Sequence, residues 1–212
     1  MKETVKFPLK SLYLEREGVR NYYYLNGKKI FELSPLELKE KISVIICTAR
    51  KLNIKKLEEN IQNLKKINIL LDIVVIVGSK KDKLSLKKLF KNEFVKVILN
   101  EDFQDTVYTS LKMGLRAINP KSMFIILLFG NQEPLEASTY HEIIQKALFS
   151  ERKIFIPTYQ ERRGHPLLFS NSILNELLSL RKEKGIPYLL RKFKQETEEI
   201  PLGDKKVLLT IK

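Results

Sequence analysis

The residues with the clearest potential for chemistry lie in one short loop, Arg162-Arg163-Gly164-His165-Pro166, within the stretch IPTYQERRGHPLLFS. Two guanidinium groups and an imidazole are more than a simple chain reversal requires, and guanidinium groups are well suited to binding phosphate. A structural role explains the same residues, because Gly164 provides a turn, Pro166 begins a strand, and His165 hydrogen-bonds nearby backbone. The sequence leaves both interpretations open.

Apolar segments around this loop predict the elements that position it. Runs that are apolar at nearly every position predict buried strands at 43–47, 73–77, 95–99, 123–129 and 153–157. Amphipathic patterns predict helices at 54–67, 83–91, 106–117 and 136–149, with short helices near 173–181 and 187–193 and a final strand at 206–211. Strands of this kind imply a sheet covered on both faces. The predicted fold class is therefore α/β, a three-layer α/β/α sandwich with a mainly parallel sheet.

Residues 1–40 differ in pattern and predict a small β-hairpin/helix extension to a domain over 41–212. Asn26-Gly27 lies between two β-prone runs and predicts a type I′ hairpin. Ser34, Pro35 and Glu37 are suited to the N-cap, first and third positions of a short helix. We expect this extension to pack against the main domain.

The charge balance favours polyanionic partners. The chain of 212 residues has 39 Lys and Arg against 25 Asp and Glu, a net charge of +14. Nucleic acid is one such partner, but the lysines are spread along the chain, which favours a solvated surface. The densest group, over 80–91, flanks a helix whose Leu86, Leu89 and Phe90 are expected to face the core.

Several classes are excluded by what the sequence lacks. Cys47 is the single cysteine and lies in an apolar run, so we expect a buried side chain, with neither a disulfide framework nor a thiolate zinc site. No apolar run reaches the ~20 residues of a membrane span, and no signal peptide is recognisable. We therefore expect a cytoplasmic protein without a membrane partner.

In open α/β sheets, ligands bind beyond the carboxyl ends of the strands. Here those ends are Thr48-Ala49-Arg50, Gly78-Ser79, Asn100-Glu101-Asp102 and Gly130-Asn131-Gln132-Glu133.

Four segments occur in a suggestive order: VVIVGS, VKVILNEDFQDTVYTSLKMGL, FIILLFGNQEPL and IFIPTYQERRGHPLLFS. Together they resemble the nucleotidyltransferases that attach CMP or GMP to the molybdenum cofactor, with the cytidylyltransferase branch the most similar. The likeness covers about residues 42–212. It implies a nucleotidyltransferase-like fold, a nucleotide and a pterin-like substrate as ligands, and Mg²⁺ as the cofactor of an active enzyme. It implies nucleotide contacts from Thr48, Ala49, Arg50, Ser79 and Ser110, and substrate contacts from Gln132, Tyr159, Arg163, Gly164 and His165.

The chain departs from the family where the family holds phosphate and metal. The glycine-rich phosphate loop is replaced by Cys47-Thr48-Ala49-Arg50-Lys51, which contains no glycine. Asn131 and Thr210 stand where the family has metal-binding aspartates, and Glu133 is a possible substitute.

These departures predict a degenerate family member that still binds a nucleotide or a pterin. One alternative is a working CTP- or GTP-dependent transferase in which Glu133 recruits Mg²⁺ and Lys51 holds the triphosphate. The other is a basic module that binds nucleic acid or a protein.

Overall fold

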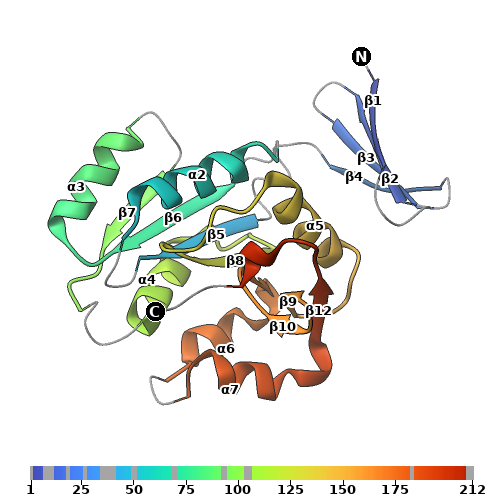
Figure 1. Cartoon of the computed structure of the whole chain (residues 1–212). Helices are drawn as coiled ribbons and strands as arrows, with labels where there is room; N and C mark the ends of the chain where they lie inside the picture. The colour runs from blue at the N-terminus through green and yellow to red at the C-terminus, as the bar shows by residue number, and fades with distance from the viewer. Residues whose placement is uncertain are drawn as a thin grey trace.

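The computed structural model describes residues 2–6, 12–17, 20–25, 28–33, 42–48, 52–67, 71–91, 95–102, 107–181 and 184–208, with only the backbone described up to residue 33. Within these ranges, β5 to β12 form one sheet of eight strands and β1 to β4 form a second sheet (Figure 1).

The main sheet is mostly parallel. Its parallel half has the order β7-β6-β5-β8 and consists of β5 (Ile42–Cys47), β6 (Asp72–Val77), β7 (Val95–Leu99) and β8 (Phe124–Phe129). The antiparallel strand β11 (Leu167–Ser170) then connects β8 to β9 (Ile154–Tyr159). Two further strands pair with β9: β12 (Thr197–Pro201) in parallel and β10 (Arg162–Arg163) antiparallel.

Helices cover both faces of this sheet. One face packs against α2 (Ile54–Lys65), α3 (Lys80–Leu89) and α5 (Ala137–Leu148). The other packs against α4 (Val107–Ala117), α6 (Leu174–Ser179) and α7 (Gly185–Lys192). In β5, Val44 and Ile46 contribute to the first core, and Ile45 and Cys47 to the second. Because both faces are buried, the strands need apolar residues at every position, and the predicted three-layer sandwich is confirmed.

The N-terminal sheet is an antiparallel meander of β1 (Lys2–Lys6), β2 (Leu12–Glu17), β3 (Arg20–Leu25) and β4 (Lys28–Leu33). Leu25 of β3 is opposite Lys28 of β4, as the predicted hairpin requires. The helix predicted after Ser34 lies outside the described residues. The division into residues 1–40 and 41–212 stays a prediction.

The end of the described chain differs from the sequence prediction. The expected strand at 206–211 is wrong in its described part, because residues Lys205–Val207 form a 3-10 helix, η3, with Asp204 as its N-cap. The strand in this region is β12, which has no apolar run because it buries only Ile200. Short 3-10 turns also occur at η1 (Asn171–Ile173) and η2 (Lys194–Glu196).

Two further side-chain predictions have different outcomes. Leu86 of α3 and Phe90, its C-cap, are buried as expected, whereas Leu89 is 40% exposed. Cys47 is fully buried, as predicted. Among the described residues, no helix combines the length and apolar character needed to cross a membrane.

Candidate functional site

The parallel strands end at a common edge, where the residues that follow β5, β7 and β8 each donate a backbone hydrogen bond to the neighbouring strand. The Thr48 amide donates to the Ile76 carbonyl at 3.0 Å, and the Asn100 amide donates to the Val77 carbonyl at 2.8 Å. The Gly130 amide donates to the Cys47 carbonyl at 2.9 Å. The structure therefore brings together the strand ends that the sequence pointed to. Residues 49–51 and 209–212 lie outside the described ranges, and with them Ala49, Arg50, Lys51 and Thr210.

Thr48 and Gly130 are in direct contact at this edge. The Thr48 hydroxyl donates to the Ile76 carbonyl at 2.9 Å, so its proton is directed at the sheet. A Cβ atom on Gly130 would lie 2.8 Å from Thr48 Cγ2, which is closer than carbon atoms approach. Glycine at 130 is thus required by the close approach of β5 and β8.

The hydroxyl groups at the neighbouring strand ends form hydrogen bonds within the fold. Ser79 is the N-cap of α3, and its Oγ accepts a hydrogen bond from the Asp82 amide at 3.0 Å. Asn100 is buried and donates to Ser110 Oγ at 3.0 Å, which fixes the start of α4 to the end of β7. Ser79 and Ser110 therefore have structural roles that do not depend on a ligand.

The turn after β8 contains the position where the resemblance led us to expect a metal-binding aspartate. Asn131, at that position, is half-buried, and Glu133 is exposed and forms an ion pair with Lys56 of α2. Gln132 between them is fully buried. Its Nε2 donates to the Lys206 carbonyl at 2.8 Å, and its Oε1 is buried without a partner in the described part of the chain.

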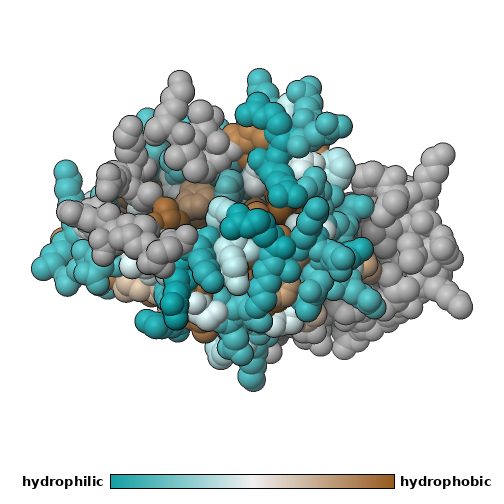
Figure 2. Space-filling view, turned by 90° about the horizontal axis from the view of Figure 1, so that it is seen from below, coloured by the Kyte–Doolittle hydropathy of each residue, from teal (hydrophilic) through white to brown (hydrophobic). Residues whose placement is uncertain are grey.

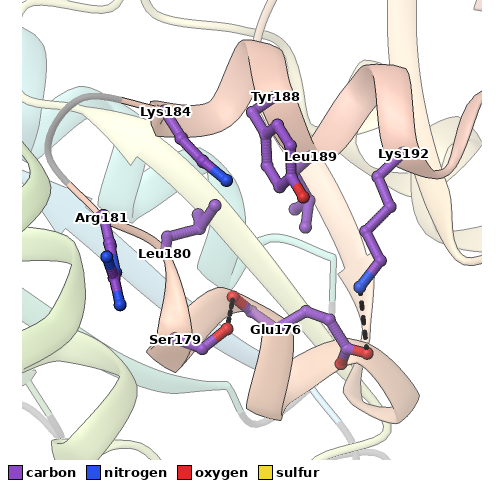
Figure 3. A pocket seen from close by; sticks show the side chains of 8 residues that line it. All are labelled: Glu176, Ser179, Leu180, Arg181, Lys184, Tyr188, Leu189 and Lys192. Atoms are coloured by element: carbon purple, nitrogen blue, oxygen red, sulfur yellow. Dashed lines mark hydrogen bonds and ion pairs between the residues drawn. The ribbon is translucent and has the colours of Figure 1, made fainter.

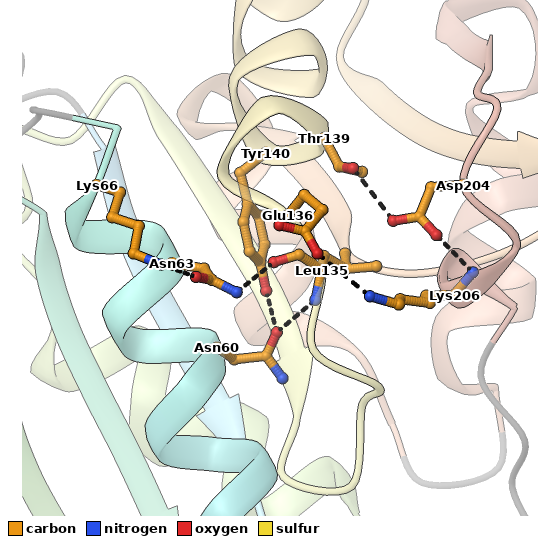
Figure 4. A network of polar contacts seen from close by, with 9 residues as sticks. All are labelled: Asn60, Asn63, Lys66, Leu135, Glu136, Thr139, Tyr140, Asp204 and Lys206. Carbon is orange, nitrogen blue, oxygen red and sulfur yellow. Dashed lines mark hydrogen bonds and ion pairs between the residues drawn. The ribbon is translucent and has the colours of Figure 1, made fainter.

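A polar network on the α2 face holds this turn (Figure 4). The Asn60 carboxamide of α2 donates to the Gln132 carbonyl and accepts from the Leu135 amide and the Tyr140 hydroxyl, at 3.0, 3.2 and 2.6 Å. Asn63, one turn further along, donates to the Leu135 carbonyl at 2.9 Å. Sequence reasoning missed Asn60 and Asn63, although their positions beside Leu57 and Ile61 on the buried face of α2 could have indicated buried polar side chains.

The Arg-Gly-His-Pro loop begins with a two-residue turn. Gln160 and Glu161 both have positive φ, 49° and 62°, and connect β9 to β10, where Arg162 is opposite Tyr159. Arg163 is exposed, and its Nε and Nη2 donate to Glu199 Oε1 of β12 at 2.7 and 2.6 Å. One of the two guanidinium groups therefore ties β10 to β12. The Tyr159 side chain is half-buried against the core on the α2 face.

Gly164 and His165 contact η3. The backbone of Gly164 packs so closely on the Val207 carbonyl that a Cβ atom would overlap it. The His165 amide donates to the same carbonyl at 2.7 Å. Since Lys206 binds Gln132, the residues of η3 connect the Arg-Gly-His-Pro loop to the turn after β8. No signal in the sequence indicated this role for residues 205–207.

The His165 imidazole lies beside the end of β8. It packs edge-on against the Phe129 ring, with centroids 4.8 Å apart. Its Nδ1 is buried and has no partner among the described residues. Burial lowers the pKa of His165 to about 4, so the ring is neutral near pH 7.

The described donors do not fit a Mg²⁺ site. No group of three or more His, Cys, Asp or Glu side chains suited to a metal ion occurs in the described ranges. Asn131 offers a neutral oxygen, Glu133 is paired with Lys56, and hard cations favour carboxylates. No catalytic step is therefore assigned to a metal ion at this edge.

Comparison with solved structures places the fold among nucleotidyltransferase-like domains. Protein Rv0371c of Mycobacterium tuberculosis superposes with a TM-score of 0.62 at 19% identity, over 76% of this chain and 88% of that one. Its manganese complex gives 0.60, with the same identity and coverage. The 4-diphosphocytidyl-2C-methyl-D-erythritol synthase of Anaerococcus prevotii gives 0.60 at 14% identity, over 81% and 93% of the two chains. Identities this low show a common fold alone.

The sequence itself shows the family. The model of the MobA-like NTP transferase domain matches residues 55–199, more than half of the chain, and the chain belongs to this family. No curated protein matches it in sequence.

Proposed function

We propose that this protein is a degenerate relative of the molybdenum-cofactor nucleotidyltransferases. It binds a nucleotide or a pterin-like compound at the carboxyl edge, the edge of the sheet where the parallel strands β5 to β8 end, and it transfers no nucleotidyl group. The observation that carries this proposal is a pair of buried polar atoms, Gln132 Oε1 and His165 Nδ1, which lack partners among the described residues. Both belong to segments held by η3. Buried polar atoms are nearly always hydrogen-bonded, so a ligand or bound water is the expected partner.

The polar chemistry of this edge supports binding more than transfer. Nucleotidyl transfer relies on positioning and on metal-assisted neutralisation of charge. Here Asn131 occupies the expected metal position, and recruiting Glu133 to a metal ion would break its ion pair with Lys56. The rival proposal, an active transferase with Glu133 on Mg²⁺, therefore has to offset the loss of that pair.

The first test is ligand-dependent thermal unfolding with CTP, GTP, ATP and molybdopterin, each with and without Mg²⁺. A ligand that binds only the folded chain stabilises it by about 2.7 kcal/mol at a hundred times its dissociation constant. We expect at least one nucleotide or the pterin to raise the midpoint, with little dependence on Mg²⁺. If none of them does, the binding half of the proposal is wrong.

The second test is transfer of labelled CMP or GMP from the triphosphate to molybdopterin. We expect no turnover from the wild-type chain, whereas ordinary enzymes turn over at about 1–1000 per second. Turnover in that range, abolished by Glu133→Gln, would establish the rival proposal.

Restoring the carboxylate provides a matched comparison. Asn131→Asp is expected to make nucleotide binding depend on Mg²⁺, because carboxylate is the ligand that this cation favours. Asn175→Asp introduces the same charge at an exposed position of α6 and should leave Mg²⁺ dependence unchanged. Equal behaviour of the two variants would argue against a ligand site beside residue 131.

A further inference from the structure

A cavity of about 350 Å³ lies between α6 and α7, and its lining contains none of the residues at the carboxyl ends of the strands (Figure 3). This volume is within the ~300–1,000 Å³ range of small-molecule sites. The cavity is lined by cationic side chains, one carboxylate, a tyrosine and two leucines.

The charges of this lining do not cancel. Lys192 Nζ lies 3.8 Å from Glu176 Oε1, so the single carboxylate is matched by one lysine. Arg181 and Lys184 remain as two further positive charges. The Arg181 carbonyl accepts hydrogen bonds from the Lys184 and Gly185 amides, but its guanidinium has no hydrogen bond or ion pair with any described residue. Lys184 Nζ lies 4.6 Å from the centroid of the Tyr188 ring. An anion placed here would find two cations that no described carboxylate neutralises.

Two leucines supply the apolar part of a mostly polar lining. Leu180 and Leu189 are 4% and 1% exposed, and Figure 3 shows Arg181 and Lys184 flanking Leu180. A small apolar area beside a pair of cations suits a ligand with an anionic group and a small apolar part.

The surrounding surface argues for a small ligand. Helices α6 and α7 lie lowest in Figure 1, and the face seen from below in Figure 2 is mostly hydrophilic, with hydrophobic residues in scattered patches. A stable protein interface usually has a continuous apolar centre. The scattered hydrophobic residues of this face therefore suit a small ligand better than a protein partner.

We propose that the α6–α7 cavity binds a small organic phosphate, with the phosphate between Arg181 and Lys184 and the apolar part over Leu180 and Leu189. Guanidinium and ammonium groups together form strong charge-assisted hydrogen bonds to phosphate oxygens. This site is separate from the carboxyl edge, and the two proposals can fail independently.

The test is isothermal titration of the full chain with phenyl phosphate at low ionic strength. We expect one site, weaker binding of inorganic phosphate, and no binding of phenol. Arg181→Ala and Lys184→Ala should each weaken binding by about tenfold, because each removes a hydrogen bond to a charged group. Arg191→Ala is the matched control: this arginine is exposed on α7, outside the cavity lining, and its loss should change the affinity by less than about twofold by charge screening.

Three results would overturn the proposal. The first is the absence of phenyl phosphate binding at millimolar concentration. The second is equal weakening by Arg181→Ala and Arg191→Ala, which would indicate diffuse attraction to a basic surface. The third is loss of both phenyl phosphate and nucleotide binding in Arg181→Ala, which would make the cavity part of the nucleotide site. Circular dichroism of each variant verifies that it is folded.

Discussion

Replacing Asn60 by alanine tests how the turn after β8 is held. Asn60 is 3% exposed, and its carboxamide makes four hydrogen bonds. One of them, to the Lys56 carbonyl, stays within α2. The other three reach Gln132, Leu135 and Tyr140. The substitution therefore removes side-chain contacts that connect α2 to both the turn and α5.

The expected cost follows from these three long-range bonds. Each contributes about 1 kcal/mol net, and a buried partner left unsatisfied adds to the loss. The higher helix propensity of alanine returns roughly 0.5 kcal/mol. We expect the free energy of unfolding to fall by about 3 kcal/mol. Tyr140→Phe, which removes only the 2.6 Å bond from the hydroxyl to Asn60, should cost about 1 kcal/mol.

Urea denaturation of the single and double variants measures these values. The two substitutions share a hydrogen bond, so the double variant should lose less than the sum of the two. Asn175→Ala, at an exposed position of α6, is the control and should change stability by less than about 0.5 kcal/mol. A loss below about 1 kcal/mol for Asn60→Ala would refute the reasoning, because losing even one buried hydrogen bond and leaving its partner unsatisfied costs at least that much.

Three further predictions concern single positions. Burial lowers the pKa of His165 to about 4 from 6.5, so the unfolded chain binds more protons between these values, and the free energy of unfolding should fall as pH drops from about 6.5 to 4. Denaturation across this range should show a smaller fall for His165→Gln; an identical pH dependence would contradict the shift. Gly164→Ala should lower the free energy of unfolding by about 1–3 kcal/mol because its Cβ would overlap the Val207 carbonyl, whereas Gly203→Ala, with open space around it, should have little effect. Cys47 is fully buried, which raises its thiol pKa to about 12. Its reaction with Ellman's reagent should therefore require unfolding, and rapid reaction of the native chain would show that β5 is accessible.

The layers of the main domain could be predicted from the sequence because they depend on local pattern. A strand with apolar residues at every position has to be buried on both faces, as β5, β6 and β8 are. Amphipathic periodicity likewise located α2, α4 and α5, and Asn26-Gly27 indicated the hairpin of β3 and β4. The order of the strands then put the carboxyl ends at a common edge, where the site was expected.

The roles of individual polar residues were decided only by the tertiary structure. Asn60 accepts hydrogen bonds from residues 75 and 80 positions away, and Gln132 donates to a carbonyl 74 positions away. Arg163, in the loop that first suggested an anion site, pairs with Glu199, 36 positions away on β12. The sequence itself determined which apolar runs must be buried, such as those of β5, β6 and β8, because the burial of a continuous apolar run follows from local pattern. Which polar groups are paired and which are left for a ligand depends on distant segments meeting, and only the folded chain brings them together.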